Sequence, residues 1–266
     1  MNSKPRRWRF AVVGLVIGTF LLSGCQTNTS LERLGMPVPA TKEGPRILSL
    51  WQGSWIAALV VGVLVWGLLI WAIVVYRRRS DDEALPKQTK YNMPIEILYT
   101  VAPLIMILGL FYFTARDQAT LTKVSNDYKH SVNVMGWRWA WGFNYTDEQA
   151  YDVGTPGIRP QLWLPVNEKV KFTLTSPDVI HSFYVPAFLF KMDIIPGRKN
   201  EFELTPDRIG VFAGKCAELC GVDHSRMLFE VHVVSRADYD KHIAQLKAKG
   251  QSGNLVHPVN EESGAS

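Results

Sequence analysis

Two cysteines, a histidine and a methionine lie within twelve positions of the segment GKCAELCGVDHSRM, residues 214–227. They are Cys216, Cys220, His224 and Met227, with the spacing C-x3-C-x3-H-x2-M. Zinc accepts thiolates and imidazoles but binds a thioether poorly, whereas thiolate, imidazole and methionine together suit copper. A disulfide between the two cysteines would need neither the histidine nor the methionine. The segment therefore favours a copper site.

The number of ligands indicates how many coppers the site holds. A mononuclear blue-copper centre uses two histidines, one cysteine and a weak methionine, so the segment has one cysteine too many and one histidine too few. His181, in SPDVIHSFYVPAF, is the best candidate for the missing ligand because it begins an apolar strand after a Pro-Asp turn. The number of ligands fits two coppers if each thiolate bridges both metals and His181 and His224 bind one copper each. We expect a binuclear electron-transfer centre and, since it leaves no open coordination position, no catalysis there. The remaining histidines are expected on the surface, at strand edges, in a helix or in the tail: His130, His232, His242 and His257.

The part of the chain that carries these ligands is rich in β-formers from His130 onward. Short alternating segments separated by Pro and Gly turns predict an antiparallel sandwich or barrel. Ser235 is expected to cap a final helix, RADYDKHIAQLKA. We therefore predict a copper domain over 116–248 and a disordered tail over 249–266.

The first apolar run resembles a signal peptide. Thirteen residues, 10–22, follow the basic segment MNSKPRRWR and are too few to span a bilayer. The run ends in LLSGC, which resembles a bacterial lipobox. We expect residues 1–24 to be removed, Cys25 to be lipidated at the new N-terminus, and residues 25–53 to form an exported segment.

Two longer apolar runs predict a transmembrane helical hairpin over 54–115. Residues 54–76 contain no charge, and residues 95–115 contain only Glu96. Each is long enough to cross about 30 Å of hydrocarbon, and a soluble domain rarely needs two such runs as buried core helices. The loop over 77–94 begins with three arginines, which places it in the cytoplasm and both outer ends of the hairpin outside.

The charge distribution gives no support for nucleic-acid binding. The chain has a formal net charge of +5, but the basic residues of the predicted signal peptide and of the 77–94 loop account for the excess. The exported remainder is close to neutral, with no basic patch of the kind that nucleic-acid partners require.

These features together resemble subunit II of the haem-copper cytochrome c oxidases that carry a binuclear copper A centre. The resemblance covers about residues 50–245, and its most specific motifs are HSFYVPAFLFKMDIIPGR, CAELCGVDHSRM and EILYTVAP. It implies a mainly β fold, a cupredoxin-like β-sandwich preceded by a two-helix transmembrane hairpin and a signal peptide. It also implies that two coppers are bound by the side chains of His181, Cys216, Cys220, His224 and Met227 and by the main-chain carbonyl of Glu218.

The resemblance assigns three further roles. The Glu218 carboxylate would reach a magnesium or manganese ion shared with subunit I. Glu96 would lie at the mouth of a proton pathway. Without the resemblance, Glu96 would be interpreted as a solvated acid that the N-terminal end of the helix dipole stabilises. Trp139, in GWRWAWGFNY, would receive electrons from cytochrome c, although an aromatic strand is more often core. Ala140 departs from the aromatic residue often found there, which leaves Trp137 and Trp141 as alternatives for this role.

The function implied is that of the electron-accepting subunit of a respiratory oxidoreductase and translocase in the bacterial cell membrane, with the copper domain on the outer face. A soluble or membrane-bound cytochrome c would deliver electrons, and subunit I, associated with other oxidase subunits, would reduce oxygen to water and translocate protons. Two alternatives remain. A quinol oxidase subunit II would lack the copper ligands, and a tethered copper carrier or sensor would need none of Glu96, Glu218 and Trp139.

Overall fold

The computed structural model describes residues 30–77, 88–155 and 157–255. The predicted signal peptide, the lipidation site Cys25 and most of the 77–94 loop therefore lie outside the described residues. Residues 30–38 belong to a separate small unit, and everything described below belongs to the unit that begins at Pro39.

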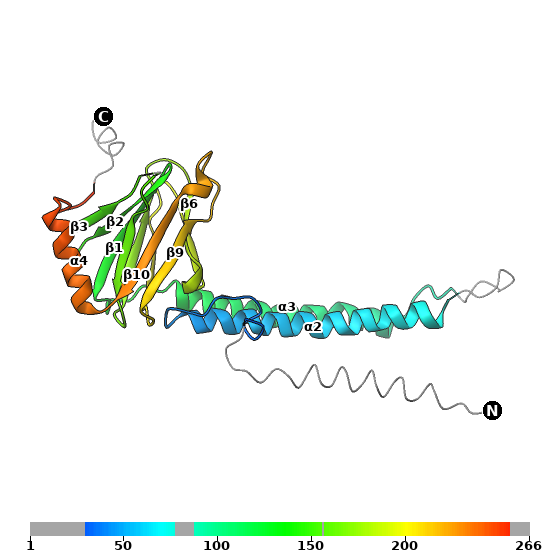
Figure 1. The fold of residues 1–266 in the computed structure, drawn as a ribbon. Coiled ribbons are helices and arrows are strands. Elements are labelled where there is room, and N and C mark those ends of the chain that lie inside the picture. Colours follow the sequence, from blue (N-terminus) through cyan, green and yellow to red (C-terminus); the bar gives the residue numbers. More distant parts are fainter. Residues whose placement is uncertain (1–29, 78–87, 156, 256–266) are drawn as a thin grey trace, which may run out of the picture. The chain divides into compact units, whose positions relative to one another are not determined.

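Two long helices precede the β-rich part (Figure 1). They are α2, Gly44–Val75, and α3, Met93–Leu121, and both are long and apolar enough to cross a membrane. At 1.5 Å per residue they measure about 48 and 44 Å, so each exceeds the hydrocarbon thickness. They extend beyond the predicted apolar runs because the helical backbone continues into polar residues at the ends.

The helices are tied to each other and to the sandwich through polar residues near one end of the hairpin. The Asp117 carboxylate of α3 binds Arg46 of α2 at 3.1 Å and its neighbour Arg116 at 2.9 Å. The Thr205 N–H donates to the Glu43 carboxylate, next to α2, at 2.9 Å. These bonds connect the apolar hairpin directly to the domain that carries the metal ligands.

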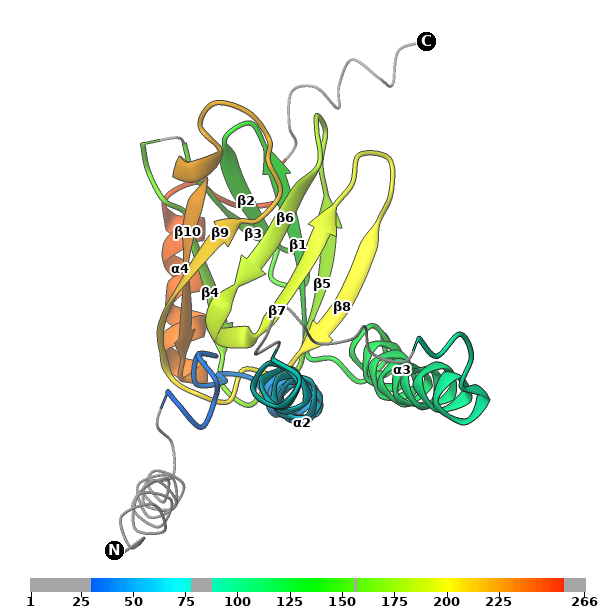
Figure 2. The ribbon, with the colours of Figure 1, turned by 90° about the vertical axis from the view of Figure 1, so that its right-hand side faces the viewer.

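Ten strands form two five-stranded sheets that face each other (Figure 2). The first sheet has the order β3-β2-β1-β5-β8 and the second β4-β10-β9-β6-β7. The strands are β1 His130–Trp137, β2 Ala140–Tyr145, β3 Ala150–Val153, β4 Gln161–Pro165, β5 Val170–Thr175, β6 His181–Val185, β7 Phe190–Ile194, β8 Asn200–Leu204, β9 Gly210–Cys216 and β10 Leu228–Val234. The predicted sandwich is confirmed, but the expected antiparallel arrangement is wrong for two pairs, since β1–β5 and β4–β10 are parallel.

The core lies between the sheets and is aromatic. Alternate residues of β5 and β10 are buried, which is the period of a strand with one face inward. Phe172 stacks on Phe202 at 4.8 Å between ring centroids, and Phe183 stacks on Phe229 at 5.1 Å. Helix α4, Arg236–Ala248, begins where predicted, with the Ser235 hydroxyl accepting the Asp238 N–H at 3.2 Å.

Two predictions about the periphery need correction. Residues 249–255 are not a free tail, because the Tyr151 N–H donates to the Gln251 carbonyl at 3.1 Å and the Leu255 N–H to the Asn144 side chain at 2.6 Å. Residues 256–266 lie outside the described part.

The expected surface position of two histidines is also wrong. His130 is buried because its ring nitrogens contact Glu148 at 2.6 Å and Glu168 at 3.0 Å, and His242 is buried with its ring stacked on Trp163 at 4.2 Å. His232 is partly buried, and its ring also stacks on Trp163, at 4.8 Å between centroids; His257 lies outside the described residues.

Candidate metal centre

Two paired strands bring the most distant ligand residues together. His181 is the first residue of β6, and Cys216 is the last residue of β9. The strands are antiparallel, with Phe183 opposite Cys216, and the Ala217 N–H donates to the Ser182 carbonyl at 3.1 Å just beyond the paired strands. Residues 35 positions apart in sequence are therefore held at one end of the same sheet.

The remaining ligand residues come from the connection between β9 and β10. Cys220 lies within it, His224 begins the short 3-10 helix η2, His224–Arg226, and Met227 immediately precedes β10. The Cys216 N–H donates to the Met227 carbonyl at 3.0 Å, which closes the loop at its base. Gly221 has a φ of +117°, a conformation that side-chain-bearing residues rarely adopt, so the glycine lets the chain turn between Cys220 and His224.

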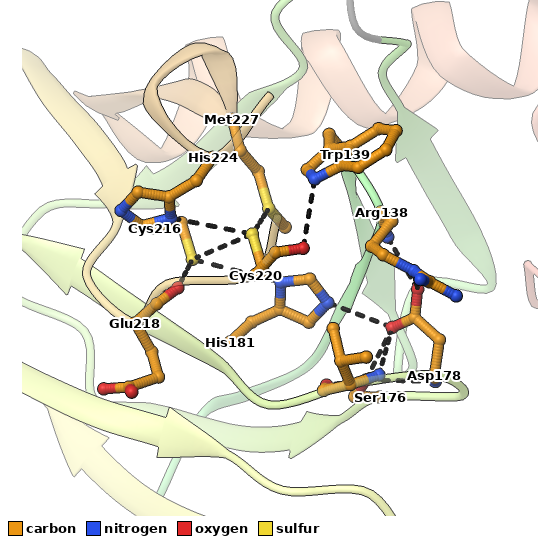
Figure 3. Close-up of polar contacts among 11 residues, drawn as sticks. Arg138, Trp139, Ser176, Asp178, His181, Cys216, Glu218, Cys220, His224 and Met227 are labelled. Carbon is orange, nitrogen blue, oxygen red and sulfur yellow. Dashed lines mark hydrogen bonds and ion pairs between the residues drawn. The ribbon is translucent and has the colours of Figure 1, made fainter. Parts of the chain in front are cut away.

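All six predicted donors converge (Figure 3). The two sulfurs lie 4.0 Å apart, the Cys216 sulfur lies 3.9 Å from the His181 Nδ1, and the Cys220 sulfur lies 3.6 Å from the His224 Nδ1 and 3.8 Å from the Met227 sulfur. The Glu218 carbonyl lies 3.2 Å from the Cys216 sulfur. A disulfide would require about 2.05 Å between the sulfurs, and in the structure both thiols are free.

Burial of the thiols makes the site favourable for a cation. Both cysteines are buried, and burial together with the neighbouring Cys216 raises the pKa of Cys220 to about 12. Two thiolates at this separation would repel each other unless positive charge lay between them. Metal binding removes both costs, since thiolates are the species that bind metal.

His181 is oriented by a partner on its far side. Its Nε2 lies 3.0 Å from an oxygen of Asp178, while its Nδ1 faces Cys216. Burial lowers the pKa of His181, which favours the neutral ring that a metal ligand must have. Burial alone would raise the pKa of Asp178, but the N–H groups of Arg138 and Val179 and the His181 ring hold it at about 2. Asp178 thus fixes which ring nitrogen is free to bind metal.

The tryptophan segment reaches the metal loop from the opposite sheet. The Trp139 indole N–H donates to the Cys220 carbonyl at 3.1 Å, and the Trp141 indole N–H donates to the Met227 carbonyl at 3.3 Å. Trp141 is fully buried, whereas Trp139 and Trp137 are partly exposed. Trp139 thus combines partial solvent exposure with a hydrogen bond to a ligand residue.

The two glutamates with predicted roles lie away from the sulfurs. The Glu218 side chain is exposed and points away from the thiols on the side opposite Trp139 (Figure 3). Glu96 lies in the first turn of α3, where its carboxylate accepts the Asn92 N–H at 2.7 Å and so caps the helix.

Asp178 and Arg138 were not predicted from the sequence as partners of the site. A short-range signal existed for Asp178, which precedes His181 by three residues in SPDVIH. No local signal existed for Arg138, whose N–H donates to Asp178 at 2.8 Å across 40 positions.

Comparison with known proteins identifies the family. A family model described as cytochrome C oxidase subunit II, periplasmic domain, matches residues 130–234. A probable cytochrome c oxidase subunit 2 of Streptomyces avermitilis is 52% identical, over 94% of this chain and 89% of the relative. The chain belongs to the cytochrome c oxidase subunit II family.

Other similar proteins include the subunit 2 of Mycobacterium tuberculosis, 32% identical over 90% of this chain and 82% of the relative. The crystal structure of the periplasmic domain of subunit II of Bradyrhizobium japonicum is 29% identical and covers 48% of this chain and 99% of that domain, with a TM-score of 0.43.

Membership in the subunit II family confirms several predictions. The protein is a membrane-protein component of an oxidoreductase complex, and its β-sandwich follows two apolar helices as expected. The family also favours the oxidase over both the quinol-oxidase and the copper-carrier alternatives. The His181, Cys216 and Cys220 donor atoms, all within 4.8 Å of one another, indicate a copper site.

Proposed function

We propose that this subunit II accepts electrons from cytochrome c at a binuclear copper A centre and passes them to the haem and copper centres of subunit I. There oxygen would be reduced to water with coupled proton translocation. The observation that carries this proposal is the convergence of the side-chain donors of His181, Cys216, Cys220, His224 and Met227 on the two thiols.

The donor distances fit direct metal coordination. Two donors bonded to one metal at about 2.0–2.3 Å, with roughly tetrahedral angles, lie about 3.3–3.8 Å apart. The distances from the Cys220 sulfur to His224 and Met227 fall in this range at 3.6 and 3.8 Å, and that from the Cys216 sulfur to His181 is slightly longer at 3.9 Å. Shared thiols allow five side chains and the Glu218 carbonyl to serve two metals. When bound, the copper pair supplies a one-electron carrier whose charge is spread over two metals.

Trp139 is proposed as the residue through which electrons enter. Its partial exposure gives a donor access, and its indole bond to the Cys220 carbonyl joins it to the metal loop. Trp141 has the corresponding bond to Met227 but is fully buried, so it remains the alternative as a second step inside the protein. Trp137 remains the alternative at the surface.

The two glutamates keep their proposed roles. The exposed Glu218 carboxylate is free of the thiols and available for a magnesium or manganese ion shared with subunit I, while its carbonyl faces Cys216. Glu96 caps α3 and is also proposed to mark the start of a proton pathway into subunit I.

We further propose the topology implied by the sequence. The arginines that begin the 77–94 loop place that loop in the cytoplasm and the copper domain on the outer face of the bacterial cell membrane. Removal of residues 1–24 as a signal peptide would leave Cys25 as the lipidated N-terminus, followed by the exported segment 25–53, the hairpin 54–115 and the copper domain 116–248.

Copper stoichiometry tests the proposal. The full chain, purified in detergent and loaded with copper while its thiols are reduced, should hold two coppers that share one unpaired electron. Its paramagnetic resonance spectrum should show more hyperfine lines than a single copper nucleus can give. Cys216→Ser and Cys220→Ser should each lose this signature, and prior oxidation of the two thiols to a disulfide should block loading. A single copper with a localised spectrum would contradict the binuclear centre.

A further inference from the structure

The surface around Trp139 combines a partly exposed aromatic ring with apolar and basic side chains. We call it the Trp139 face; it consists of Arg138, Trp139, Ile158, Arg159, Val222 and Arg226. The loop that holds Arg159 and the segment that holds Arg226 line, together with Trp139 and Ala140, a cavity of about 250 Å³. A Cβ built on Gly221 would lie 3.1 Å from the Trp139 ring, so the backbone at Gly221, which Val222 follows in sequence, approaches this ring closely.

Arg138 and Arg226 of the face are more exposed to solvent than the aspartates that pair with them. The Arg138 side chain is 52% exposed and binds Asp178, 17% exposed, at 3.3 Å. The Arg226 side chain is 64% exposed and binds Asp223, 30% exposed, at 3.4 Å. The two charges of an exposed ion pair of this kind offset each other only in part. The arginine, which is the more exposed of the two, therefore contributes more to the charge that a binding partner would contact.

Arg159 adds a positive charge without an ion-pair partner among the described residues. It is exposed to solvent. Three arginines against two recessed aspartates leave the face with a net positive charge. Glu218, the nearest exposed acid of the metal loop, lies on the opposite side of the thiols from Trp139 (Figure 3).

The face also includes two exposed apolar side chains, Ile158 and Val222. Ile158 lies between Gly157 and Arg159, which line the cavity beside Trp139, and Val222 follows Gly221, which approaches the Trp139 ring. Interfaces of electron-transfer partners are small, and a hydrophobic centre with a charged rim allows them to associate quickly by electrostatic steering and to separate again. The Trp139 face combines exposed apolar side chains with an excess of positive charge.

We propose that the electron donor of this subunit docks on the Trp139 face through an acidic surface, with aspartates and glutamates around an exposed haem edge. This rests on the proposed function of Trp139 as the point where electrons enter. One electron leaves the ferrous haem iron of the donor, which becomes ferric, and reduces the copper centre by one electron; no bond forms and no proton moves. A donor whose haem edge is ringed by lysines would meet like charge on this face.

Electron delivery to the purified intact oxidase tests the proposal with two probes: a lysine-rich cytochrome c, and the same cytochrome after succinylation of its lysines. The second-order rate constant for the succinylated donor should fall as ionic strength rises, because salt screens attraction. Arg159→Glu should lower that constant at low salt by about 3-fold to 10-fold and raise the constant for the lysine-rich donor. Arg159→Lys should retain the original value. Lys241→Glu, an equal change of charge on exposed α4, should leave both constants unchanged.

A further variant distinguishes the proposal of an acidic docking partner from the proposal that electrons enter at Trp139. Trp139→Phe should slow delivery from both donors while the copper spectrum stays the same, and unchanged rates would refute Trp139 as the point where electrons enter. If Trp139→Phe slows both donors but Arg159→Glu leaves the succinylated donor unaffected or faster, the acidic docking partner is refuted and the role of Trp139 stands. The proposal of an acidic partner would also be refuted if the rate constant for the lysine-rich donor fell as salt was added and was lower still in Arg159→Glu.

Discussion

Asp178→Asn should weaken copper binding without altering any ligand. In the structure both Asp178 oxygens are used: one accepts from Val179 and from the His181 ring at 2.6 and 3.0 Å, and the other accepts from the Arg138 N–H at 2.8 Å. Asparagine has one oxygen and one amide donor, so it cannot accept on both sides. If its oxygen faces His181, its NH2 group opposes the Arg138 N–H; if it is turned over, His181 loses its acceptor.

The magnitude follows from the bond that is lost. A hydrogen bond to a charged group contributes about 1.5–3 kcal/mol. The partner of a metal-binding histidine typically accounts for about 10-fold to 100-fold in metal affinity, which is about 1.4–2.7 kcal/mol. The two estimates agree. We therefore expect the copper affinity of Asp178→Asn to fall by about 10-fold to 100-fold, because His181 is no longer held with its Nδ1 toward Cys216.

Competition for copper against a chelator of known affinity measures this loss in the full chain. Asp147→Asn, an exposed aspartate in a turn, is the matched control and should bind copper as the unchanged protein does. Thermal unfolding of the metal-free variant separates positioning from stability. A lower unfolding temperature with an unchanged copper affinity would show that Asp178 stabilises the fold only, and would refute its role in positioning His181.

Two other perturbations follow from the structure. Gly221→Ala should slow electron delivery although Trp139 itself is not replaced, because the new Cβ would lie 3.1 Å from the indole and displace it, and because a φ of +117° strains any side chain; unchanged delivery and an unchanged indole environment by fluorescence would contradict this. Burial, helped by Lys249 and His232, lowers the pKa of His242 from 6.5 to about 4. Between these values the unfolded chain binds a proton that the folded chain does not, so the free energy of unfolding should fall by about 2 kcal/mol from pH 7 to pH 4. His242→Gln should flatten this dependence in thermal unfolding, and an equal slope in both proteins would count against it.

The metal centre was largely predictable because four of its side chains come from one short loop. The spacing of Cys216, Cys220, His224 and Met227 carries the chemistry in sequence, and His181 followed from the count of ligands. The partner Arg138 was not predictable, since its contact with Asp178 depends on how the turn between β1 and β2 meets the opposite sheet. Contacts between sheets leave no periodic signal in either segment.

The sandwich was predictable as a class, but its strand order and its buried polar residues were not. Alternation identifies strands of either direction equally well, so the parallel pairs β1–β5 and β4–β10 could not be distinguished from antiparallel ones. His130 looked like a surface residue because histidine is usually at least partly exposed. Its burial depends on Glu148 and Glu168, which lie 18 and 38 positions away.

One turn of the first sheet connects donor access and metal binding. Its residues Arg138 and Trp139 are consecutive, and they hold different parts of the site: Arg138 reaches His181 through Asp178, and Trp139 binds the Cys220 carbonyl directly. The ligands themselves belong to the second sheet and its β9–β10 connection. The turn that carries the proposed entry tryptophan therefore also holds a histidine and a cysteine-bearing loop of the candidate metal centre in place. Because both contacts depend on one backbone segment, a donor that pressed on this turn would act on the positions of the ligands as well as on the path of the electron.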